Sequence, residues 1–492
     1  MRSHVLRVCA GAALLTAFLA SGGCTEIYLL FGPGAVFGPQ QSAVSGGSTT
    51  TRSTAIPSPL FTAEQLDPAL EATAGAKIIV AAQMNDDNGD GVIDGNDEID
   101  FLSGSNESQP IQLHLNNGGG ASFTTITIAG GGPIAKMVGL QVADFDMDGR
   151  PDIAVLVNDT GFTPVTNASL RGAVVLLFAP PNPADALAWQ EVTVSETFVL
   201  PGDDIGMTDF AVGEIDKAVE ADGVTPRGPD IVLGSNEHGD ATKFIRLFLN
   251  PGRAGGGVHG SRNGATWGAS SIITIDAVPF QSLKLADIDR DGDLDIVATY
   301  PTAKTFNVRW LVNPLVPAGV AAVSAGTWRR VMVGQQQDGG DFLDVGDIDG
   351  DGDVDVGVAK RIDGLVQWFR NPDDPAAGVN VVSQQTFPWD VFNLGSIQSN
   401  FSMNQMQLVD LNADGTVDCF VTASGNMVGF QRGSEVHDFW PGFSIVATNP
   451  VAEIGTCAFA DVNRDGLIDI AAPLDRTGLT QDQFLLLRRV SR

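Results

Sequence analysis

Asp287-Ile-Asp-Arg-Asp-Gly-Asp-Leu-Asp295 is one of five copies of a nine-residue pattern in this chain of 492 residues. Each copy follows D-h-[DN]-x-D-G-x-x-D, where h is apolar. The other regular copies span residues 144–152, 347–355, 410–418 and 461–469, and two degenerate copies begin at Asp86 and Glu214. The copies recur about every 60 residues, and a period of this length predicts an array of equivalent structural units.

Short apolar runs flank each copy at regular positions. Residues 283–286 precede the copy that begins at Asp287, and residues 296–299 come directly after it. A third run often ends in Asn-Pro, as in Val308-Arg-Trp-Leu-Val-Asn-Pro314, and a fourth often opens with tryptophan, at Trp189, Trp267, Trp328 and Trp389. These runs are rich in β-branched and aromatic residues and bounded by Gly, Pro, Asn and Asp, so we interpret each as a strand.

Four strands per repeat and seven repeats predict an all-β fold, a seven-bladed β-propeller of four-stranded blades over residues 55–490. We place the blades near residues 76–130, 137–200, 206–275, 281–333, 342–394, 404–447 and 454–490. The last repeat has a third strand at 484–487, and Arg492 comes too soon for a fourth. We therefore expect the segment from Thr54 to Leu66 to complete the last blade, because an open blade would expose an unpaired edge.

The repeated loops carry the candidate metal ligands. Carboxylate oxygens at positions 1, 3, 5 and 9 surround one point, Gly at position 6 allows a sharp turn, and Ca²⁺ takes six to eight such oxygens. The candidate ligands are Asp144, Asp146, Asp148, Asp152, Asp287, Asp289, Asp291, Asp295, Asp347, Asp349, Asp351, Asp355, Asp410, Asn412, Asp414, Asp418, Asp461, Asn463, Asp465 and Asp469. The degenerate copies add Asp86, Asn88, Asp90, Asp94, Glu214, Asp216, Asp222 and Asp230, for about five to seven Ca²⁺ ions in all.

Two other interpretations of the loops make different demands on the sequence. Ordinary Asp-Gly turns without metal would leave several like charges within nine residues to repel one another. An EF-hand needs an acid at position 12, where the regular copies have Val155, Ala298, Val358, Val421 and Ala472. The regular loops therefore fit a strand–loop–strand hairpin. Only the loop at Asp86 has an acid there, Asp97, which leaves an EF-hand-like or dockerin-like insertion open.

Composition limits the function classes. Acidic residues number 59 against 28 basic ones, for a net charge of −31, which excludes nucleic acid as a partner because phosphates require Lys and Arg. The chain is 43% hydrophobic, too apolar for a disordered acidic protein.

The N-terminus is expected to be a targeting signal. Arg2 and Arg7 precede an apolar run over 8–20, and small residues then lead to Cys24. This order resembles a bacterial lipoprotein signal, with residues 1–23 removed, Cys24 lipidated, and residues 24–54 forming a flexible tether. Ser21 departs from that pattern, so a plain secretory signal remains the alternative. Either signal implies export.

Cys419 and Cys457 are the other two cysteines of the exported body. Strand geometry places them at heights that differ by roughly 10 Å, beyond the Cα separation of a disulfide. We expect buried free thiols, with a disulfide as the alternative.

Together the loops and strands resemble the FG-GAP/VCBS repeat proteins, whose best-known fold is the integrin alpha-subunit propeller. The resemblance covers nearly all of the exported part. It implies calcium at the base of the blades and ligand contacts on the opposite face. The integrin ligand-partner domains are absent, so integrin-type adhesion is not implied.

The sequence indicates a binding function more than catalysis. His114, His238, His259 and His437 are scattered, and no nucleophile or phosphate-binding motif occurs. We expect a monomeric, envelope-anchored protein- or glycan-binding or scaffold module that meets membrane only through the lipid. The alternatives are an enzyme similar to polysaccharide lyases with calcium-loop propellers, and a purely structural envelope protein. The tryptophans are expected to pack between blades rather than to stack on sugars.

Overall fold

The structure is a computed structural model. It describes residues 56–57, 61–65, 76–105, 111–128, 137–157, 173–194, 204–238, 243–253, 259–268, 270–276, 280–300, 307–315, 323, 328–334, 341–360, 364–372, 389–397, 403–423, 425–433, 436–437, 439–447, 452–476 and 483–490. The expected signal peptide, Cys24 and the tether lie outside these residues. No helix within them has both the length and the apolar character needed to cross a membrane.

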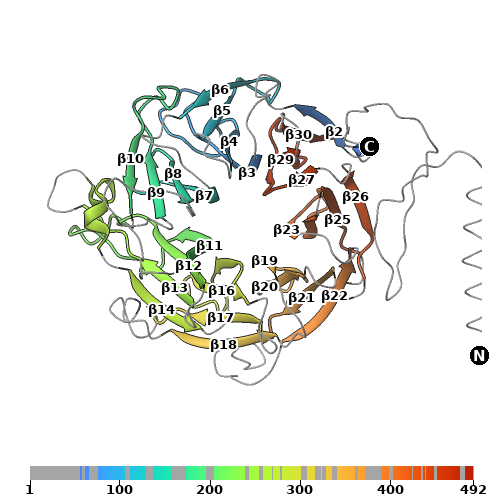
Figure 1. The fold of residues 1–492 in the computed structure, drawn as a ribbon. Coiled ribbons are helices and arrows are strands. Elements are labelled where there is room, and N and C mark those ends of the chain that lie inside the picture. The colour runs from blue at the N-terminus through green and yellow to red at the C-terminus, as the bar shows by residue number, and fades with distance from the viewer. Residues whose placement is uncertain are drawn as a thin grey trace, which may run out of the picture.

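Seven antiparallel sheets stand around a central axis, which confirms the predicted seven-bladed propeller (Figure 1). Blades 1 to 3 consist of β3 (Ala76–Ala82), β4 (Asp100–Ser105), β5 (Gln112–Asn116) and β6 (Phe123–Thr127); β7 (Met137–Ala143), β8 (Asp152–Val157), β9 (Ala173–Phe178) and β10 (Gln190–Thr193); and β11 (Asp204–Gly213), β12 (Asp230–His238), β13 (Lys243–Phe248) and β14 (Ser271–Asp276). Blades 4 and 5 consist of β15 (Leu283–Ala286), β16 (Asp295–Thr299), β17 (Val308–Val312) and β18 (Arg329–Gly334); and β19 (Phe342–Gly346), β20 (Asp355–Ala359), β21 (Leu365–Arg370) and β22 (Asp390–Ser396).

Blades 6 and 7 recruit strands from the N-terminal side of the first repeat. Blade 6 contains β23 (Met403–Val409), β24 (Asp418–Ala423), β25 (Asn426–Phe430) and β26 (Gly442–Ala447), with β1 (Ile56–Pro57) added at its outer edge. Blade 7 contains β27 (Ala452–Ile454), β28 (Ala458–Ala460), β29 (Asp469–Arg476) and β30 (Gln483–Arg489). Its outer strand is β2 (Phe61–Gln65), which pairs with β30 from Phe61↔Arg489 to Gln65↔Leu485. The predicted closure by the segment from Thr54 to Leu66 is therefore confirmed within residues 61–65.

The first strand of each blade is the innermost one, and the first strands contact each other in all neighbouring pairs of blades except blades 6 and 7, where β24 contacts β27 (Figure 1). The second and third strands lie between sheets on both faces. They are accordingly apolar without alternation: every residue of β16 and of β20 is buried. The outer strands are more exposed: in β18, Arg330 is exposed while Val331 and Val333 are buried.

The core is divided into seven clusters, one between each pair of adjacent blades. Trp189, Trp267, Trp328 and Trp389 each fill one cluster, as predicted, and Trp440 fills the cluster between blades 5 and 6. The indole N–H groups of four of them donate to nearby backbone carbonyls, for example Trp328 Nε1 to Val323 O at 3.0 Å; the four are Trp189, Trp267, Trp328 and Trp440. Burial in these clusters leaves the tryptophans unable to stack on a bound sugar.

Cys419 and Cys457 are free and buried, which confirms the expected thiols. Cys419 lies in β24, and Cys457 precedes β28, so the two belong to neighbouring blades. Burial raises the pKa of both thiols far above the usual value.

Candidate metal centres

All seven acidic loops join the first strand of a blade to its second. Because every blade has the same connectivity, the loops lie on one face of the ring, and successive loops face neighbours from adjacent blades. Each regular loop begins directly after a first strand and ends at the Asp that opens the second. The sequence therefore predicted both the hairpin and its position in the blade.

The local fold of the loop follows from its Asp and Gly residues. The carboxylate at position 1 accepts a bond from the N–H of the Gly at position 6, at 2.7 Å for Asp144 and Gly149 and 3.0 Å for Asp287 and Gly292. That Gly has a φ of 83° to 90° in the five regular loops, a region that side chains disfavour. Position 4 is also left-handed, and in four of the five loops it is not glycine, as at Arg290 (φ 58°).

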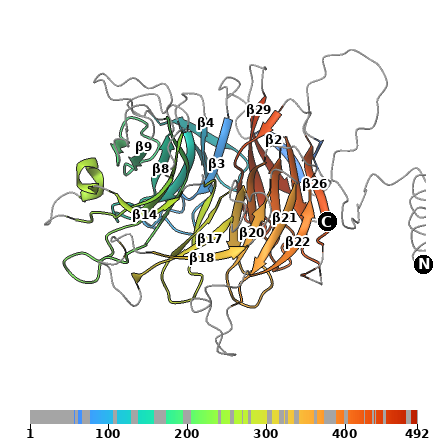
Figure 2. The ribbon, with the colours of Figure 1, turned by 60° about the horizontal axis from the view of Figure 1, so that its bottom comes forward.

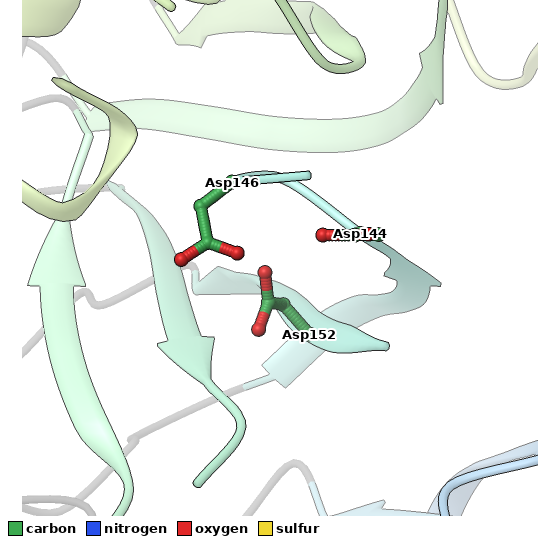
Figure 3. A group of neighbouring side chains, drawn as sticks. All are labelled: Asp144, Asp146 and Asp152. Carbon is green, nitrogen blue, oxygen red and sulfur yellow. The ribbon is translucent and has the colours of Figure 1, made fainter. Parts of the chain in front are cut away.

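Three loops gather carboxylate oxygens within 4.8 Å of one another. The groups are Asp287, Asp289 and Asp291 in blade 4; Asp347, Asp349 and Asp351 in blade 5; and Asp144, Asp146 and Asp152 in blade 2. Figure 3 shows the blade 2 group, in which the carboxylates of Asp146 and Asp152 turn toward each other. Oxygens of this kind and spacing suit a hard cation.

The blade 4 loop offers the clearest fit to calcium. The Oδ1 atoms of Asp287 and Asp289 are buried and have no hydrogen-bond partner. Burial, with a smaller contribution from Asp291, raises the pKa of Asp289 to about 6. Both facts express the cost of burying negative charge without a positive partner, and a bound cation would reverse it.

In blades 6 and 7 an asparagine replaces the middle acid. Asn412 Nδ2 donates to Asp414 Oδ2 at 2.7 Å, and Asn463 Nδ2 donates to Asp465 Oδ2 at 3.0 Å. Position 1 still caps the turn, since Asp410 and Asp461 accept the N–H of the loop glycine. These loops keep the same fold with one fewer negative charge.

The two degenerate loops depart from the pattern in different ways. In blade 1, Asp86 accepts the N–H groups of Gly89, Asp90 and Gly91, and the flanking elements are the strands β3 and β4, so no helix–loop–helix surrounds it. The buried Asp97 accepts N–H bonds from Asp87, Asn88 and Asp94. The carboxylate of Asp97, the acid at position 12, therefore accepts hydrogen bonds from the backbone of its own loop.

The blade 3 loop separates its predicted ligands. Glu214 and Asp216 lie near Asp230, and like-charge repulsion contributes to the raised pKa of Glu214 and of Asp230, while burial is the main cause for all three. Asp222 instead caps an exposed turn, where the Thr225 hydroxyl at 2.6 Å lowers the pKa of Asp222 to about 2. Asp222 therefore does not join Glu214, Asp216 and Asp230 in one group.

The last aspartate of six of the seven loops has a second, structural role. In blade 5, Asp355 accepts the N–H of Ile348 at 2.9 Å and the N–H of Asn371 at 2.7 Å. Equivalent pairs of bonds reach Asp100, Asp152, Asp230, Asp295 and Asp418. This carboxylate therefore ties the loop to the end of the third strand, and Asp100, not Asp94, does so in blade 1.

The asparagine of the Asn-Pro pairs is a functional residue whose role sequence reasoning missed. Its side-chain Nδ2 donates to the position 2 carbonyl of the preceding blade: Asn313 to Ile215 at 2.9 Å and Asn371 to Ile288 at 3.0 Å. The recurrence of Asn-Pro was the available signal. These bonds, with that of Asn250 to Phe145, fix the acidic loops of blades 2, 3 and 4 against the next blade.

Basic side chains also reach the loops. Arg262 pairs with Asp146 and Asp148, and Arg370 pairs with Asp349 and Asp351. Position 4 residues reach across to the next blade as well: Lys217 pairs with Asp293, and Arg290 with Asp353. The acidity of the loops is thus partly neutralised within the chain.

A polar cavity of about 430 Å³ opens on the same face, beside the blade 1 loop. Its walls carry Asn85, Asp87, Glu98, Asn116 and Arg464. Asn85 Oδ1 is buried without a hydrogen-bond partner, and burial raises the pKa of Asp87. The family resemblance placed ligand contacts on the opposite face, so this cavity was not anticipated.

The histidines that the structure describes do not form a catalytic group. His114 is buried in blade 1, with Nε2 2.8 Å from Ser103 Oγ and Nδ1 2.9 Å from Thr125 Oγ1. His259 lies in blade 3, and His437, after β25 of blade 6, stacks on Trp368 and makes a tilted ring contact with Phe392, both of blade 5. The side chain of His238 lies outside the described residues.

Comparison with known protein families agrees with this architecture. The FG-GAP-like repeat family matches residues 93–155, from the blade 1 loop into β8. No curated protein matches the chain. A solved structure described as "Crystal structure of BBS1N in complex with ARL6DN, soaked with lead" is similar at 12% identity and a TM-score of 0.45, over 88% of this chain and 98% of that chain. From its own sheets and the family match, the chain is a seven-bladed β-propeller that carries an FG-GAP-like repeat.

Proposed function

We propose that the protein is an exported, envelope-anchored, calcium-binding propeller that serves as a protein- or glycan-binding or scaffold module. The observation that carries the calcium part is the buried, unpartnered Oδ1 of Asp287 and of Asp289 in blade 4. The carboxylates of Asp347, Asp349 and Asp351 in blade 5 repeat the arrangement. In blades 6 and 7, Asn412 and Asn463 would supply amide oxygens, which Ca²⁺ accepts as ligands.

Calcium would neutralise the clustered carboxylates and hold the first and second strands of a blade together at one end. The chain's own groups do the positioning: the loop glycine N–H holds position 1, and the last aspartate holds the loop against the third strand. We therefore expect calcium to stabilise the ring rather than to take part in chemistry.

A calcium titration of the full chain tests this proposal. We expect the melting temperature to rise with calcium, because an ion that binds only the folded state stabilises it by mass action. Asp287→Asn should remove one bound ion, counted by native mass spectrometry, because all five regular loops have Asp at this position. Asp390→Asn is the matched control, since Asp390 is exposed outside the loops. No rise in melting temperature and no bound ion would contradict the proposal.

The cavity beside the blade 1 loop supports the glycan side of the proposal. Amide and carboxylate groups such as Asn85, Asp87 and Glu98 can bond several hydroxyls of one sugar, and the volume is within the range of small-ligand sites. A glycan array with the calcium-loaded protein should give hits that Glu98→Gln weakens at least tenfold. Hits unchanged by this substitution would place the ligand elsewhere, and product formation from a hit would favour the lyase-like alternative.

Export and anchoring rest on the N-terminal sequence. We propose that Cys24 is lipidated after removal of residues 1–23. Mass spectrometry of the N-terminal peptide from the native host should show an acylated Cys24, and Cys24→Ser should release the protein from the membrane fraction. A mature N-terminus at another residue would favour the plain secretory signal.

A further inference from the structure

The blade 2 loop gathers a different set of carboxylates from the loops of blades 4 and 5. Those two loops bring together positions 1, 3 and 5, whereas blade 2 brings together positions 1, 3 and 9, with Asp148 at position 5 left out. The sequence of this loop matches the regular pattern, so the difference does not come from a missing acid. It comes from what surrounds Asp148.

Two guanidinium groups hold Asp148. Its Oδ2 accepts a bond from Arg262 Nη2 at 3.0 Å and another from Arg150, and its Oδ1 accepts the N–H of Arg150 at 3.0 Å. Arg262 Nε also pairs with Oδ2 of Asp146. One planar fork thus bridges positions 3 and 5, and the two arginines together carry the charge of one Ca²⁺.

Contacts outside the acidic loop fix the position of Arg262. It ends the 3₁₀ helix η1 (Gly260–Arg262), a part of blade 3 that lies between β13 and β14. Gln190 of blade 2 donates to the carbonyl of Arg262 at 3.1 Å, and the guanidinium lies 4.8 Å from the ring centre of Phe178. The Arg262 side chain is only 19% exposed. A preorganised, partly desolvated guanidinium is well suited to pair with carboxylates.

The anchor of η1 is itself buried. His259 accepts the Ser261 N–H at 3.3 Å, and Trp267 Nε1 donates to the Ser261 carbonyl at 3.0 Å. Trp267 belongs to the core between blades 2 and 3. The interblade core therefore sets the position of Arg262.

Arg370 in blade 5 provides a contrast. It also pairs with the acids at positions 3 and 5, but it comes from the third strand of the same blade and is 42% exposed. The carboxylates of Asp347, Asp349 and Asp351 stay together beside it. Arg370 accompanies a cluster of positions 1, 3 and 5, whereas Arg262 accompanies a cluster from which position 5 is missing.

We propose that Arg262, assisted by Arg150, takes the place of calcium in the blade 2 loop, so that this blade keeps its loop folded without metal. The inference rests on the proposed calcium binding of the other loops. It predicts that the stability of blade 2 does not depend on calcium concentration.

Ion counting on the full chain by native mass spectrometry gives the first test. Asp144→Asn should leave the calcium count of the otherwise unchanged protein as it is. Arg262→Gln should add one ion, and Asp144→Asn in the Arg262→Gln background should remove that ion. Loss of an ion from Asp144→Asn alone, or no gain from Arg262→Gln, would overturn the inference. Asp287→Asn should lose one ion in either case, so its failure would instead count against the proposed function.

Thermal melting in a chelator gives a second test that does not need bound metal. Arg262→Gln should lower the melting temperature in excess EDTA by several degrees, because Asp146 and Asp148 lose their counter-charge, and calcium should restore it. Arg253→Gln is the matched control, because the Arg253 guanidinium donates to a backbone carbonyl of the same loop, Met147 O at 3.4 Å, rather than to a loop carboxylate. An Arg262→Gln protein that melts in EDTA at the wild-type temperature would overturn the inference.

Discussion

In six of the seven acidic loops, the last aspartate is both a candidate calcium ligand and an acceptor of two backbone hydrogen bonds. In blade 5, Asp355 is fully buried and accepts one backbone N–H from its own loop and one from the residue after the third strand. Sequence reasoning gave this residue only to calcium. The structure indicates that the loop would keep its shape through this carboxylate even before an ion binds.

Asp355→Ala should therefore destabilise the protein without any metal present. Two buried N–H groups lose their acceptor, and each such loss costs about 1–3 kcal/mol, so we expect about 3 kcal/mol in total. Thermal or urea unfolding in EDTA measures this loss of stability. Asp390→Ala, at an exposed site in β22, should change little. An unchanged unfolding midpoint for Asp355→Ala would show that the carboxylate acts only through metal.

The two cysteines should be unreactive toward thiol reagents in the folded protein. Burial raises the pKa of the Cys419 and Cys457 thiols, and the thiolate is the reactive form. Because the folded pKa lies above the usual value, raising the pH to 9 should not start labelling by iodoacetamide. Both thiols should label after unfolding in urea. Labelling of either thiol in the native protein at pH 9 would contradict the buried environment.

Neighbouring blades pack against each other where a glycine of one sheet meets an aromatic ring of the next. Gly395 of β22 lies against Phe430 of β25 in the next blade, and a Cβ at position 395 would come within 2.2 Å of the Phe430 ring. Gly334 and Phe369 repeat the arrangement between blades 4 and 5. The absence of a side chain at these glycines makes room for a ring from the neighbouring sheet.

Gly395→Ala should accordingly cost about 1–3 kcal/mol, the usual range for overpacking. The double variant Gly395→Ala with Phe430→Leu should cost less than the sum of the two single changes, because the smaller side chain removes the clash. Gly433→Ala is the control, since a Cβ there meets nothing within 4 Å. Equilibrium unfolding of the four proteins measures the coupling, and strict additivity would contradict the packing argument.

The fold and the candidate calcium ligands could be predicted from the sequence, whereas the polar contacts between distant residues could not, for physical reasons. The loop pattern and the apolar runs predicted blades, strand order and the burial of Trp189 or Trp389, because these are local patterns with a fixed period. Apart from the packing of the tryptophans, contacts between individual residues of different blades were not predicted. Arg262 lies more than one hundred residues from the acids it meets, and Asn371 reaches Ile288 in another blade. Neither partner can be found from local spacing.

The ring as a whole is closed by β2, which supplies the outer strand of blade 7 (Figures 1 and 2). Phe61 is buried in the core between blades 6 and 7, so the strand contributes packing as well as hydrogen bonds. Without it, β30 would be an exposed edge. Integrity of the molecule therefore depends on residues before the first repeat.

Deletion of residues 1–66 should lower the melting temperature by more than about ten degrees and promote association through the open edge of β30, because an unpaired edge strand is a template for pairing with another chain. Deletion of residues 1–54 keeps β1 and β2 and should leave the melting temperature of the propeller unchanged. Melting curves and size-exclusion chromatography of the two truncated proteins check this. Equal behaviour of both would show that closure by β2 contributes nothing to stability.

The pairing of Phe61 with Arg489 also orders the events of biosynthesis. The two strands are separated by on the order of 400 residues, so joining them costs more loop-closure entropy than any hairpin within a blade. As the chain emerges, each later blade can form from neighbouring strands, while β2 must wait for the last strand to be made. We expect ring closure to be the slow, final step of folding, and any prematurely terminated chain to remain an open arc.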